Sequence, residues 1–244
     1  MRPSTRRTGT SYADVDRDAY LGSIGSVRRA QGEAIVRIAR EHVSGGEWLD
    51  VGCGFGYVLD AARAAGFRIR GIEPDAVAAE AARTRLGNVT RGFLDDSAPP
   101  ADVVSTLDVI EHLDDLPAFA ELVKRKTRAL WVIKVPSSDG LFFRVAHALR
   151  IRSAVERLWQ AEYEHPHVVY FDEATLTRFL RNHGFTVIAT HYLEEVPTAT
   201  AVDRLVLGGT PRWKARLALP VFAAINAIER LLRKSDALVV VAKG

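Results

Sequence analysis

The segment Trp48-Leu-Asp-Val-Gly-Cys-Gly-Phe-Gly56 decides the fold of this chain. With Glu47 before it, the first part of the segment is a short apolar run, which is typical of a buried strand. The second part has a glycine at every other position, and an alanine-rich run with helical periodicity begins at Tyr57. A glycine loop between an apolar strand and a helix is typical of cofactor-binding α/β folds.

The spacing of the glycines separates two classes of cofactor. The dinucleotide fingerprint is Gly-x-Gly-x-x-Gly, in which the third glycine lets the helix approach the strand. Here the third glycine is Gly56, and the position that the fingerprint reserves for it is Tyr57. This spacing favours S-adenosylmethionine (SAM), which brings no pyrophosphate to the helix N-terminus. We therefore expect the glycines to let bare backbone approach the methionyl and ribose parts of SAM.

A second cofactor contact is expected at Ile72-Glu73-Pro74-Asp75, where the second apolar run ends. A carboxylate at the end of the second strand can accept hydrogen bonds from both hydroxyls of a ribose. Glu73 lies at about the expected distance past the glycine loop, so we predict that it binds the ribose. The alternative interpretation is an ordinary surface glutamate at the end of a strand.

Strand and helix patterns alternate along the chain around this segment. Such alternation predicts an α/β, Rossmann-like, doubly wound sheet with helices on both faces. We predict seven strands, with helical insertions before the sixth and the seventh at about 137–171 and 198–235. Residues 1–25 are polar and lack periodicity, so we expect an N-terminal arm or lid there and one domain over 26–244. The predicted strands are 47–51, 67–72, 89–92, 101–106, 129–135, 185–193 and 237–242. The predicted helices are 26–43, 57–65, 75–86, 116–126, 140–159, 172–183 and 212–234. We expect Asp172 as the N-cap and Gly184 as the C′ residue of the helix over 172–183, and an interruption at Pro220 in the last helix.

The composition limits the class of protein. With 244 residues and ordinary globular composition, the chain can bury a sizeable core without disulfides or structural metal. Its single cysteine, Cys53, excludes an intrachain disulfide and fits a reducing compartment. No window has the pattern of a secretory signal, and no run reaches the roughly 20 apolar residues that span a bilayer. We therefore expect a cytoplasmic protein.

Three successive motifs, Trp48–Gly56, Gly71-Ile-Glu-Pro-Asp75 and Asp108-Val-Ile-Glu-His-Leu113, resemble those of the class I SAM-dependent methyltransferases. The resemblance is strongest to the branch that contains ubiquinone-pathway O-methyltransferases and many small-molecule and sugar methyltransferases. It implies SAM as the cofactor and a mostly parallel sheet whose last strand is antiparallel. It covers about residues 26–195 and the last strand, and it continues through Lys134-Val-Pro-Ser137, His167-Val-Val-Tyr-Phe171 and Asn182-His-Gly-Phe185.

The resemblance also implies a role for individual residues in cofactor binding. Asp50 and Gly52 would hold the amino end of the methionine, and Gly54 and Gly56 would shape the loop. Glu73 would bind the ribose, as its position in the sequence already predicts. The remaining implied contacts are Asp95 to the adenine with Leu94 beside the ring, and Leu107 and Asp108 next to the sulfonium.

The chain departs from the family pattern before the fifth strand. Most relatives have a Pro-Gly-Gly turn at this point, whereas this chain has Lys124-Arg-Lys-Thr127. We expect a different turn conformation there and an unaltered cofactor site.

Methyl transfer from SAM is an in-line displacement at carbon, and the sulfonium is already a good leaving group. The protein mainly aligns the acceptor and excludes water, and a base is needed only for a hydroxyl or a carbon acid. We predict His112, His167 and Asp108 as catalytic candidates, because the end of the fourth strand and the first insertion both face the cofactor in this fold. Glu111 and His165 are further candidates. In the alternative interpretation, His112 and His167 are structural residues.

A metal site is the competing interpretation of the same region. Some ubiquinone-pathway relatives use an acidic residue and a Glu-His pair to bind a divalent cation, and Asp108, Glu111 and His112 match that pattern. The Glu-His pair also occurs widely in relatives without known metal, so we predict no metal here.

We predict a small-molecule acceptor that is methylated at oxygen, in a natural-product, sugar, glycan or quinone pathway. RNA or protein methylation is one alternative, and a non-catalytic SAM-binding scaffold is another. No appended binding module is recognisable, and Leu107-Asp-Val-Ile110 stands where an Asn-Pro-Pro-Tyr type of tetrapeptide would follow the fourth strand. We therefore expect no nucleic-acid partner.

Two apolar stretches with interleaved basic residues, 141–150 and 213–222, have two interpretations. Such segments can lie on a membrane surface or bind a lipid-linked acceptor. We favour helices that cover the sheet and the acceptor pocket with their apolar faces, with the basic side chains in solvent.

Overall fold

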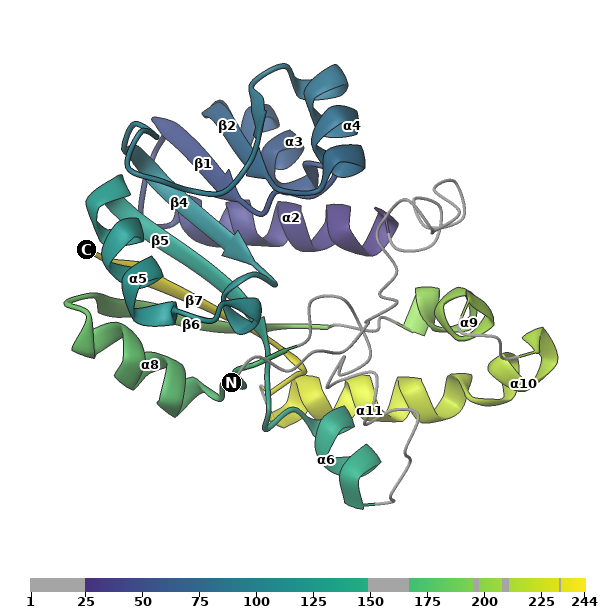
Figure 1. The fold of residues 1–244 in the computed structure, drawn as a ribbon. Coiled ribbons are helices and arrows are strands. Elements are labelled where there is room, and N and C mark those ends of the chain that lie inside the picture. Colours follow the sequence, from purple (N-terminus) through teal and green to yellow (C-terminus); the bar gives the residue numbers. More distant parts are fainter. Residues whose placement is uncertain (1–24, 149–166, 195–197, 208–210, 233) are drawn as a thin grey trace, which may run out of the picture.

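A seven-stranded sheet in the order β3-β2-β1-β4-β5-β7-β6 forms the centre of the protein (Figure 1). The structure is a computed structural model that describes residues 25–148, 167–194, 198–207, 211–232 and 234–244. Neighbouring strands from β3 to β5 are parallel, whereas β7 is antiparallel to both β5 and β6. The predicted fold and the antiparallel last strand are thus confirmed. The strands are β1 Glu47–Val51, β2 Arg68–Glu73, β3 Val89–Arg91, β4 Ala101–Leu107, β5 Thr127–Pro136, β6 Thr186–Leu193 and β7 Ala237–Lys243.

Helices cover both faces of the sheet because the buried strands are apolar on both sides. Alternate residues point to opposite faces, so Trp48 and Leu130 lie in one core cluster while Leu49 and Trp131 lie in the other. The first cluster is shared with α2 and α3, and the second with α5 and α8. The helices of these two layers are α2 Gly25–Arg40, α3 Tyr57–Ala64, α4 Ala76–Leu86, α5 Leu116–Lys126 and α8 Glu173–Asn182.

Local capping explains where several helices begin. The Asp172 carboxylate accepts a hydrogen bond from the Thr175 backbone N–H, and the Thr175 side chain bonds back to the Asp172 backbone. This reciprocal arrangement is a capping box, which satisfies backbone donors that the helix itself leaves free. Gly184 follows the helix with a φ of 75°, in the left-handed region that glycine adopts freely. The predicted N-cap and C′ residues of α8 are confirmed.

The connection between α5 and β5 has no separate turn. Helix α5 ends at Lys126, as predicted, and β5 begins at Thr127, so residues 124–127 differ from the Pro-Gly-Gly turn of the family pattern. The Thr127 hydroxyl donates to the carbonyl of Val123, which would otherwise lack a partner at the helix end. The Lys126 ammonium donates to the carbonyl of Asp96. These two bonds replace the glycine turn of the family pattern.

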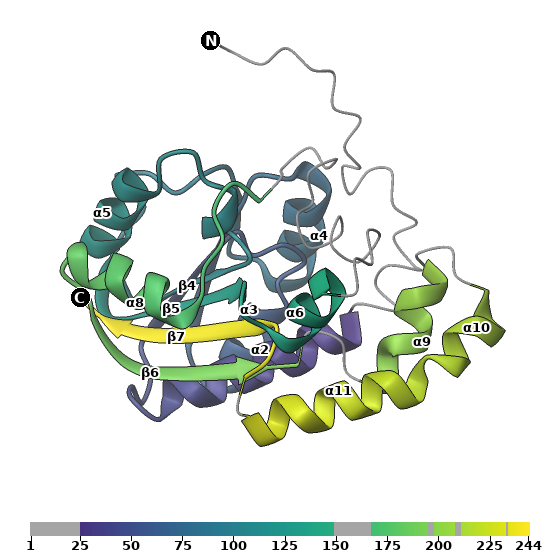
Figure 2. The ribbon, with the colours of Figure 1, turned by 90° about the horizontal axis from the view of Figure 1, so that it is seen from below.

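In the described parts of the chain, four further helices follow the carboxyl ends of β5 and β6, on the same edge of the sheet as the glycine loop (Figures 1 and 2). Helix α9 lies in the insertion predicted to be helical at about 198–235, but its bounds were not predicted, because its Thr and Val residues lower helix propensity. Packing against α10 and α11 stabilises it. The predicted break at Pro220 lies instead at Ala218, since a proline is tolerated in the first turn of a helix. The predicted helix over 140–159 is described only to Ala148, and the predicted arm over 1–25 lies outside the described residues except for Gly25. The four helices are α6 Leu141–Ala148, α9 Thr198–Leu207, α10 Arg212–Leu217 and α11 Leu219–Leu232.

Candidate active site

The glycine loop connects β1 to α3 and is held by the end of β2. The backbone N–H groups of Gly52 and Cys53 both donate to the carbonyl of Ile72, at 2.8 and 3.1 Å. Gly52 has a φ of 72°, and a Cβ there would lie 2.5 Å from the Val109 side chain. Gly54 also has a positive φ, of 51°, but a Cβ there would meet no atom within 4 Å. The loop is therefore closed against the protein at Gly52 and open at Gly54.

Glu73 is a buried carboxylate that binds the glycine loop. Its Oε2 atom accepts a hydrogen bond from the Gly54 N–H at 2.7 Å, and its Oε1 atom accepts one from the Asp75 N–H at 2.9 Å. Burial raises the pKa of Glu73, although these two bonds act in the opposite direction. A carboxylate has about four acceptor positions, so two remain for a ligand.

Asp50 lies at the end of a buried hydrogen-bond chain. The Trp48 indole N–H donates to the Ser105 hydroxyl at 2.8 Å, and that hydroxyl donates to the Asp50 carboxylate at 2.6 Å. Burial raises the pKa of Asp50 to about 7, and the charge of Glu73 raises it further while the Ser105 bond lowers it. Asp50 therefore changes charge near neutral pH.

Asp108 turns the chain sharply at the end of β4. Its φ of 54° is the only positive value at a non-glycine residue in the described part of the chain, and aspartate tolerates this region better than most residues. Its carboxylate accepts bonds from the Lys134 ammonium at 2.8 and 2.9 Å and from the Arg28 guanidinium at 2.5 Å. These two cations outweigh burial and hold the pKa of Asp108 well below its usual range. A carboxylate stabilised in this way is a weak base.

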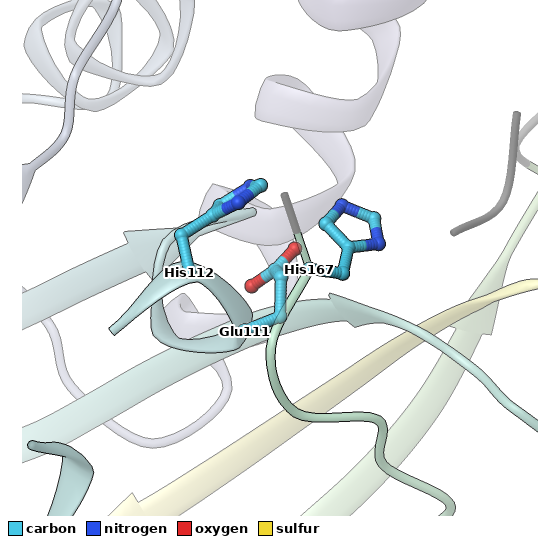
Figure 3. A group of neighbouring side chains, drawn as sticks. All are labelled: Glu111, His112 and His167. Atoms are coloured by element: carbon cyan, nitrogen blue, oxygen red, sulfur yellow. The ribbon is translucent and has the colours of Figure 1, made fainter. Parts of the chain in front are cut away.

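A short 3₁₀ turn after β4, Ile110–His112, brings three predicted residues together. Figure 3 shows the side chains of Glu111, His112 and His167 pointing toward one another. The ring centroids of His112 and His167 lie 4.7 Å apart, and the Glu111 carbonyl accepts the N–H groups of Val168 and Val169. These two backbone hydrogen bonds hold the segment that begins at His167 against the 3₁₀ turn. Glu111 and His112 lie near the glycine loop, because the turn that carries them follows Val109, whose side chain lies beside Gly52.

Glu111 is almost fully buried, at 2% exposure, and neither of its carboxylate oxygens has a hydrogen-bond partner among the described residues. Burial raises the pKa of Glu111 well above its usual range, and the nearby Asp108 charge adds to the effect. An unsatisfied buried polar group is costly unless a ligand or a water supplies the missing bond.

The same three side chains have the composition of a metal site. One ligand atom from each of Glu111, His112 and His167 lies within 4.8 Å of the others. Two imidazoles and one carboxylate suit a divalent transition metal. The sequence pattern had suggested Asp108 as the third ligand, but Asp108 is bound by Lys134 and Arg28, and His167 takes its place beside the pair.

The residues predicted beside the adenine, Leu94 and Asp95, and the residue Leu107 predicted beside the sulfonium differ in burial. Leu94 is buried in the core and Leu107 is half-buried. Asp95 is exposed, and its carboxylate accepts bonds from the backbone and the hydroxyl of Ser97, which lower its pKa. Phe93 was not predicted, yet its ring is 80% exposed directly beside Leu94. His165 lies outside the described residues.

The sequence motifs do not reveal the side chains that bind the predicted residues Asp108 and Asp50. Arg28 and Lys134 bind Asp108, and Ser105 binds Asp50. Lys134 could have been recognised from the sequence, because a lysine within the apolar run of a central strand requires a buried partner. Ser105 could not, since a serine is common in strands for many other reasons.

Comparison with known families identifies the chain. A family model described as a methyltransferase domain matches residues 25–190, which is more than half of the sequence. The chain belongs to the methyltransferase domain family. It is a class I SAM-dependent methyltransferase, and its cofactor is SAM. The loop fits this cofactor, because the backbone at Gly54 is open and the buried carboxylates of Asp50 and Glu73 lie beside it.

Solved methyltransferase structures share the fold at low sequence identity. A SAM-dependent methyltransferase from Archaeoglobus fulgidus is 20% identical, with a TM-score of 0.57 over 88% of this chain and 94% of its own. The magnesium protoporphyrin IX methyltransferase of Synechocystis PCC 6803, with bound SAH, is 14% identical, with a TM-score of 0.60 over 93% and 91%. A methyltransferase from Haloferax volcanii, in complex with the Trm112 methyltransferase activator, is 18% identical, with a TM-score of 0.64 over 98% and 99%. No curated protein matches the sequence.

Proposed function

We propose that this methyltransferase transfers a methyl group to a hydroxyl oxygen of a small-molecule acceptor, with His112 accepting the hydroxyl proton. The observation that carries the proposal is the packing of His112 against His167 and the buried Glu111, with His112 on the turn that follows Val109 beside Gly52. The proposed acceptor belongs to a natural-product, sugar, glycan or quinone pathway. The Synechocystis neighbour, whose named substrate is a porphyrin, is an example of a small-molecule methyltransferase with this fold.

The proposal includes the cofactor contacts that the resemblance to SAM-dependent methyltransferases implies. Asp50 and Gly52 hold the amino end of the methionine, Gly54 and Gly56 form the loop, and Glu73 holds the ribose. Leu94 and Asp95 lie on the adenine side, with Leu107 and Asp108 on the sulfonium side. When bound, SAM supplies a methyl group on a positively charged sulfur, so the residues around it need only align an acceptor and remove its proton.

Asp108 is a positioning residue in this proposal. Its ion pairs with Lys134 and Arg28 hold the carboxylate in its charged form and fix the turn that leads to His112. His167 packs on His112 from the other side and limits the rotation of its ring. Proton transfer then falls to His112, an imidazole whose ordinary pKa suits a base near neutral pH.

Replacing Glu73 with alanine is expected to weaken SAM binding by about 1.5–3 kcal/mol, because hydrogen bonds to a charged group are lost. Calorimetry with SAM measures the change. Glu80→Ala is the matched control, since Glu80 is an exposed glutamate on the neighbouring α4 that pairs only with residues of its own helix. Unchanged SAM affinity in Glu73→Ala would show that the ribose lies elsewhere.

The affinity for SAM is expected to rise with pH toward neutrality. The pKa of Asp50 is raised to about 7 in the free protein, so the carboxyl is protonated at acid pH and must lose its proton to pair with an ammonium group. Between pH 6 and pH 7.5 the affinity should rise on the order of 10-fold, and it should level off above the pKa. Calorimetry in buffers of different ionisation enthalpy measures both the affinity and the released proton. The Asp50→Asn variant should lose this dependence, and a parent affinity that is flat with pH would contradict the assignment.

Metal removal separates the two interpretations of the trio. If His112 acts as a base, extensive dialysis against a chelator should leave the methyl-transfer rate unchanged. If Glu111, His112 and His167 hold a metal, the rate should fall and should return when a divalent cation is added back. Elemental analysis of the purified protein gives an independent measurement.

Isotope labelling tests the proposed function as a whole. The purified protein is incubated with ¹³C-methyl SAM and a cell extract, and the extract is then separated into small molecules, protein and RNA. We expect the label in the small-molecule fraction, with the carbon chemical shift of a methyl ether or ester. Label on nitrogen or carbon would overturn O-methylation, and label in protein or RNA would overturn the small-molecule acceptor. SAM binding without any transferred label would indicate a scaffold.

A further inference from the structure

Helices α10 and α11 turn an apolar surface away from the rest of the protein. The side chains of Trp213, Leu217 and Leu231 are 63%, 70% and 83% exposed. Six of the eight large hydrophobic side chains that are exposed in the described part of the chain lie on these two helices. Isolated exposed hydrophobics are ordinary, but a contiguous group marks a surface for interaction. We call this group the apolar face; it consists of Trp213, Leu217, Val221, Ile228, Leu231 and Leu232.

The spacing of these residues places them along one side of the helices. Within α11, Val221, Ile228 and Leu232 recur at intervals of seven and four residues, which is the period of one helix face. The opposite side is buried against the protein and carries Phe222 and Asn226. The two helices therefore carry apolar side chains on their solvent-exposed side as well as on the side that packs against the protein.

This finding corrects an expectation from the sequence. The favoured interpretation had the apolar side chains of 213–222 covering the sheet and the acceptor pocket. Phe222 does pack inward, but Leu217 and Val221 are exposed. The other stretch, 141–150, is described only to residue 148, so Arg150 and Arg152 lie outside the described residues.

The charged residues of α10 and α11 are basic apart from one buried glutamate. Arg212, Lys214 and Arg216 are all exposed on α10 and surround Trp213, with the Lys214 ammonium 5.4 Å from the centre of the Trp213 ring. The only acidic residue in the described parts of 211–232 is Glu229, which is buried and accepts a hydrogen bond from the Ser235 hydroxyl. Exposed apolar side chains with basic residues beside them, and no exposed acid, are the pattern of a helix that lies in the surface of an anionic bilayer.

We propose that the apolar face docks on an anionic lipid bilayer, with Trp213, Leu217 and Val221 in the headgroup region and the three basic residues of α10 against lipid headgroups. No helix in the described ranges has the length and apolar character to cross a membrane, so the contact is with the surface. Since α9, α10 and α11 follow the carboxyl end of β6 (Figures 1 and 2), docking brings the edge that carries the glycine loop near the lipid. The proposal is independent of which atom the enzyme methylates.

Co-sedimentation of the full chain with vesicles tests the proposal. We compare vesicles of phosphatidylcholine alone with vesicles that also contain phosphatidylserine, at low and at high salt. The protein should sediment with the mixed vesicles at low salt and should be released at high salt, where charges are screened. Equal binding to both kinds of vesicle, or no binding to mixed vesicles at low salt, would overturn the proposal.

Two variants assign the binding to this face. Removing three charges with Arg212→Gln, Lys214→Gln and Arg216→Gln should weaken partitioning by about 5-fold each, or on the order of 100-fold together. The matched control removes three exposed arginines of α8 and the start of β2, through Arg68→Gln, Arg178→Gln and Arg181→Gln, and should bind like the parent.

The second variant, Leu217→Ser with Val221→Ser and Leu231→Ser, should lose binding while its melting temperature stays close to that of the parent, since these side chains are exposed. Equal loss of vesicle binding in the charge variant and in its control would mean that the net charge of the protein, and not this face, determines binding. Light scattering that shows a parent dimer, and a monomer in the serine variant, would mean that a second copy covers the face. Either result would overturn the proposal.

Discussion

His112→Ala is expected to lower kcat by about 10²–10⁴-fold and to leave the affinity for SAM close to that of the parent. The reason is that His112 adjoins the glycine loop through the turn after β4 but belongs to none of the residues assigned to the cofactor. Turnover is measured with the acceptor that isotope labelling identifies, and SAM affinity is measured by calorimetry.

Controls separate a base from a structural residue at this position. The exposed His42 supplies the matched control, because His42→Ala removes the same side chain away from the site and should keep full activity. Added imidazole should restore part of the activity of His112→Ala if the ring acts as a base. A variant that loses melting temperature and activity together, without rescue, would show that His112 is structural.

Lys134→Met is expected to lower the free energy of unfolding by about 3 kcal/mol. Removing one partner of a buried ion pair typically costs about 3–5 kcal/mol, because the remaining charge is left without compensation. We expect the lower end of this range, since Arg28 still binds Asp108 in the variant. Methionine keeps most of the apolar volume of the lysine, so the loss reports the charge and not a cavity. Urea unfolding measures it.

The double variant Lys134→Met with Asp108→Asn provides the control for this prediction. Removing both charges should restore part of the lost stability, because the buried carboxylate is gone and Arg28, which then loses this partner, is about a third exposed and can be hydrated. A single variant within about 0.5 kcal/mol of the parent would contradict the prediction, since that is the range of ordinary surface substitutions.

The fold was predictable because its signals are local. The glycine loop follows an apolar strand directly, and the helix caps at Asp75 and Asp172 lie within three residues of the groups that they bind. The longer strands also repeat their apolar pattern often enough to be recognised, whereas the three-residue β3 has one buried side chain. The bounds of helix α9 within the predicted helical insertion escaped prediction, because tertiary packing, which short-range patterns do not contain, outweighs its weak propensity.

The site was predictable only in part, because its groups come from distant positions. His112 and His167 were both predicted as candidates, but nothing in the sequence indicated that their rings pack together across 55 residues. The partners of Asp108 also lie outside its motif, with Arg28 on α2, 80 residues away, and Lys134 on β5, 26 residues away. Such contacts depend on strand order and register, which the sequence motifs do not specify.

The position of β7 has a consequence for how the protein folds during synthesis. This strand is made last, yet it lies between β5 and β6 and forms hydrogen bonds to both. Until residues 237–243 leave the ribosome, the ten-residue β5 has an open edge, and β6 has no strand to pair with. Open apolar edges recruit other chains. The nascent protein therefore passes through a stage in which its cofactor-binding half can be complete while β5 and β6 still have unpaired edges.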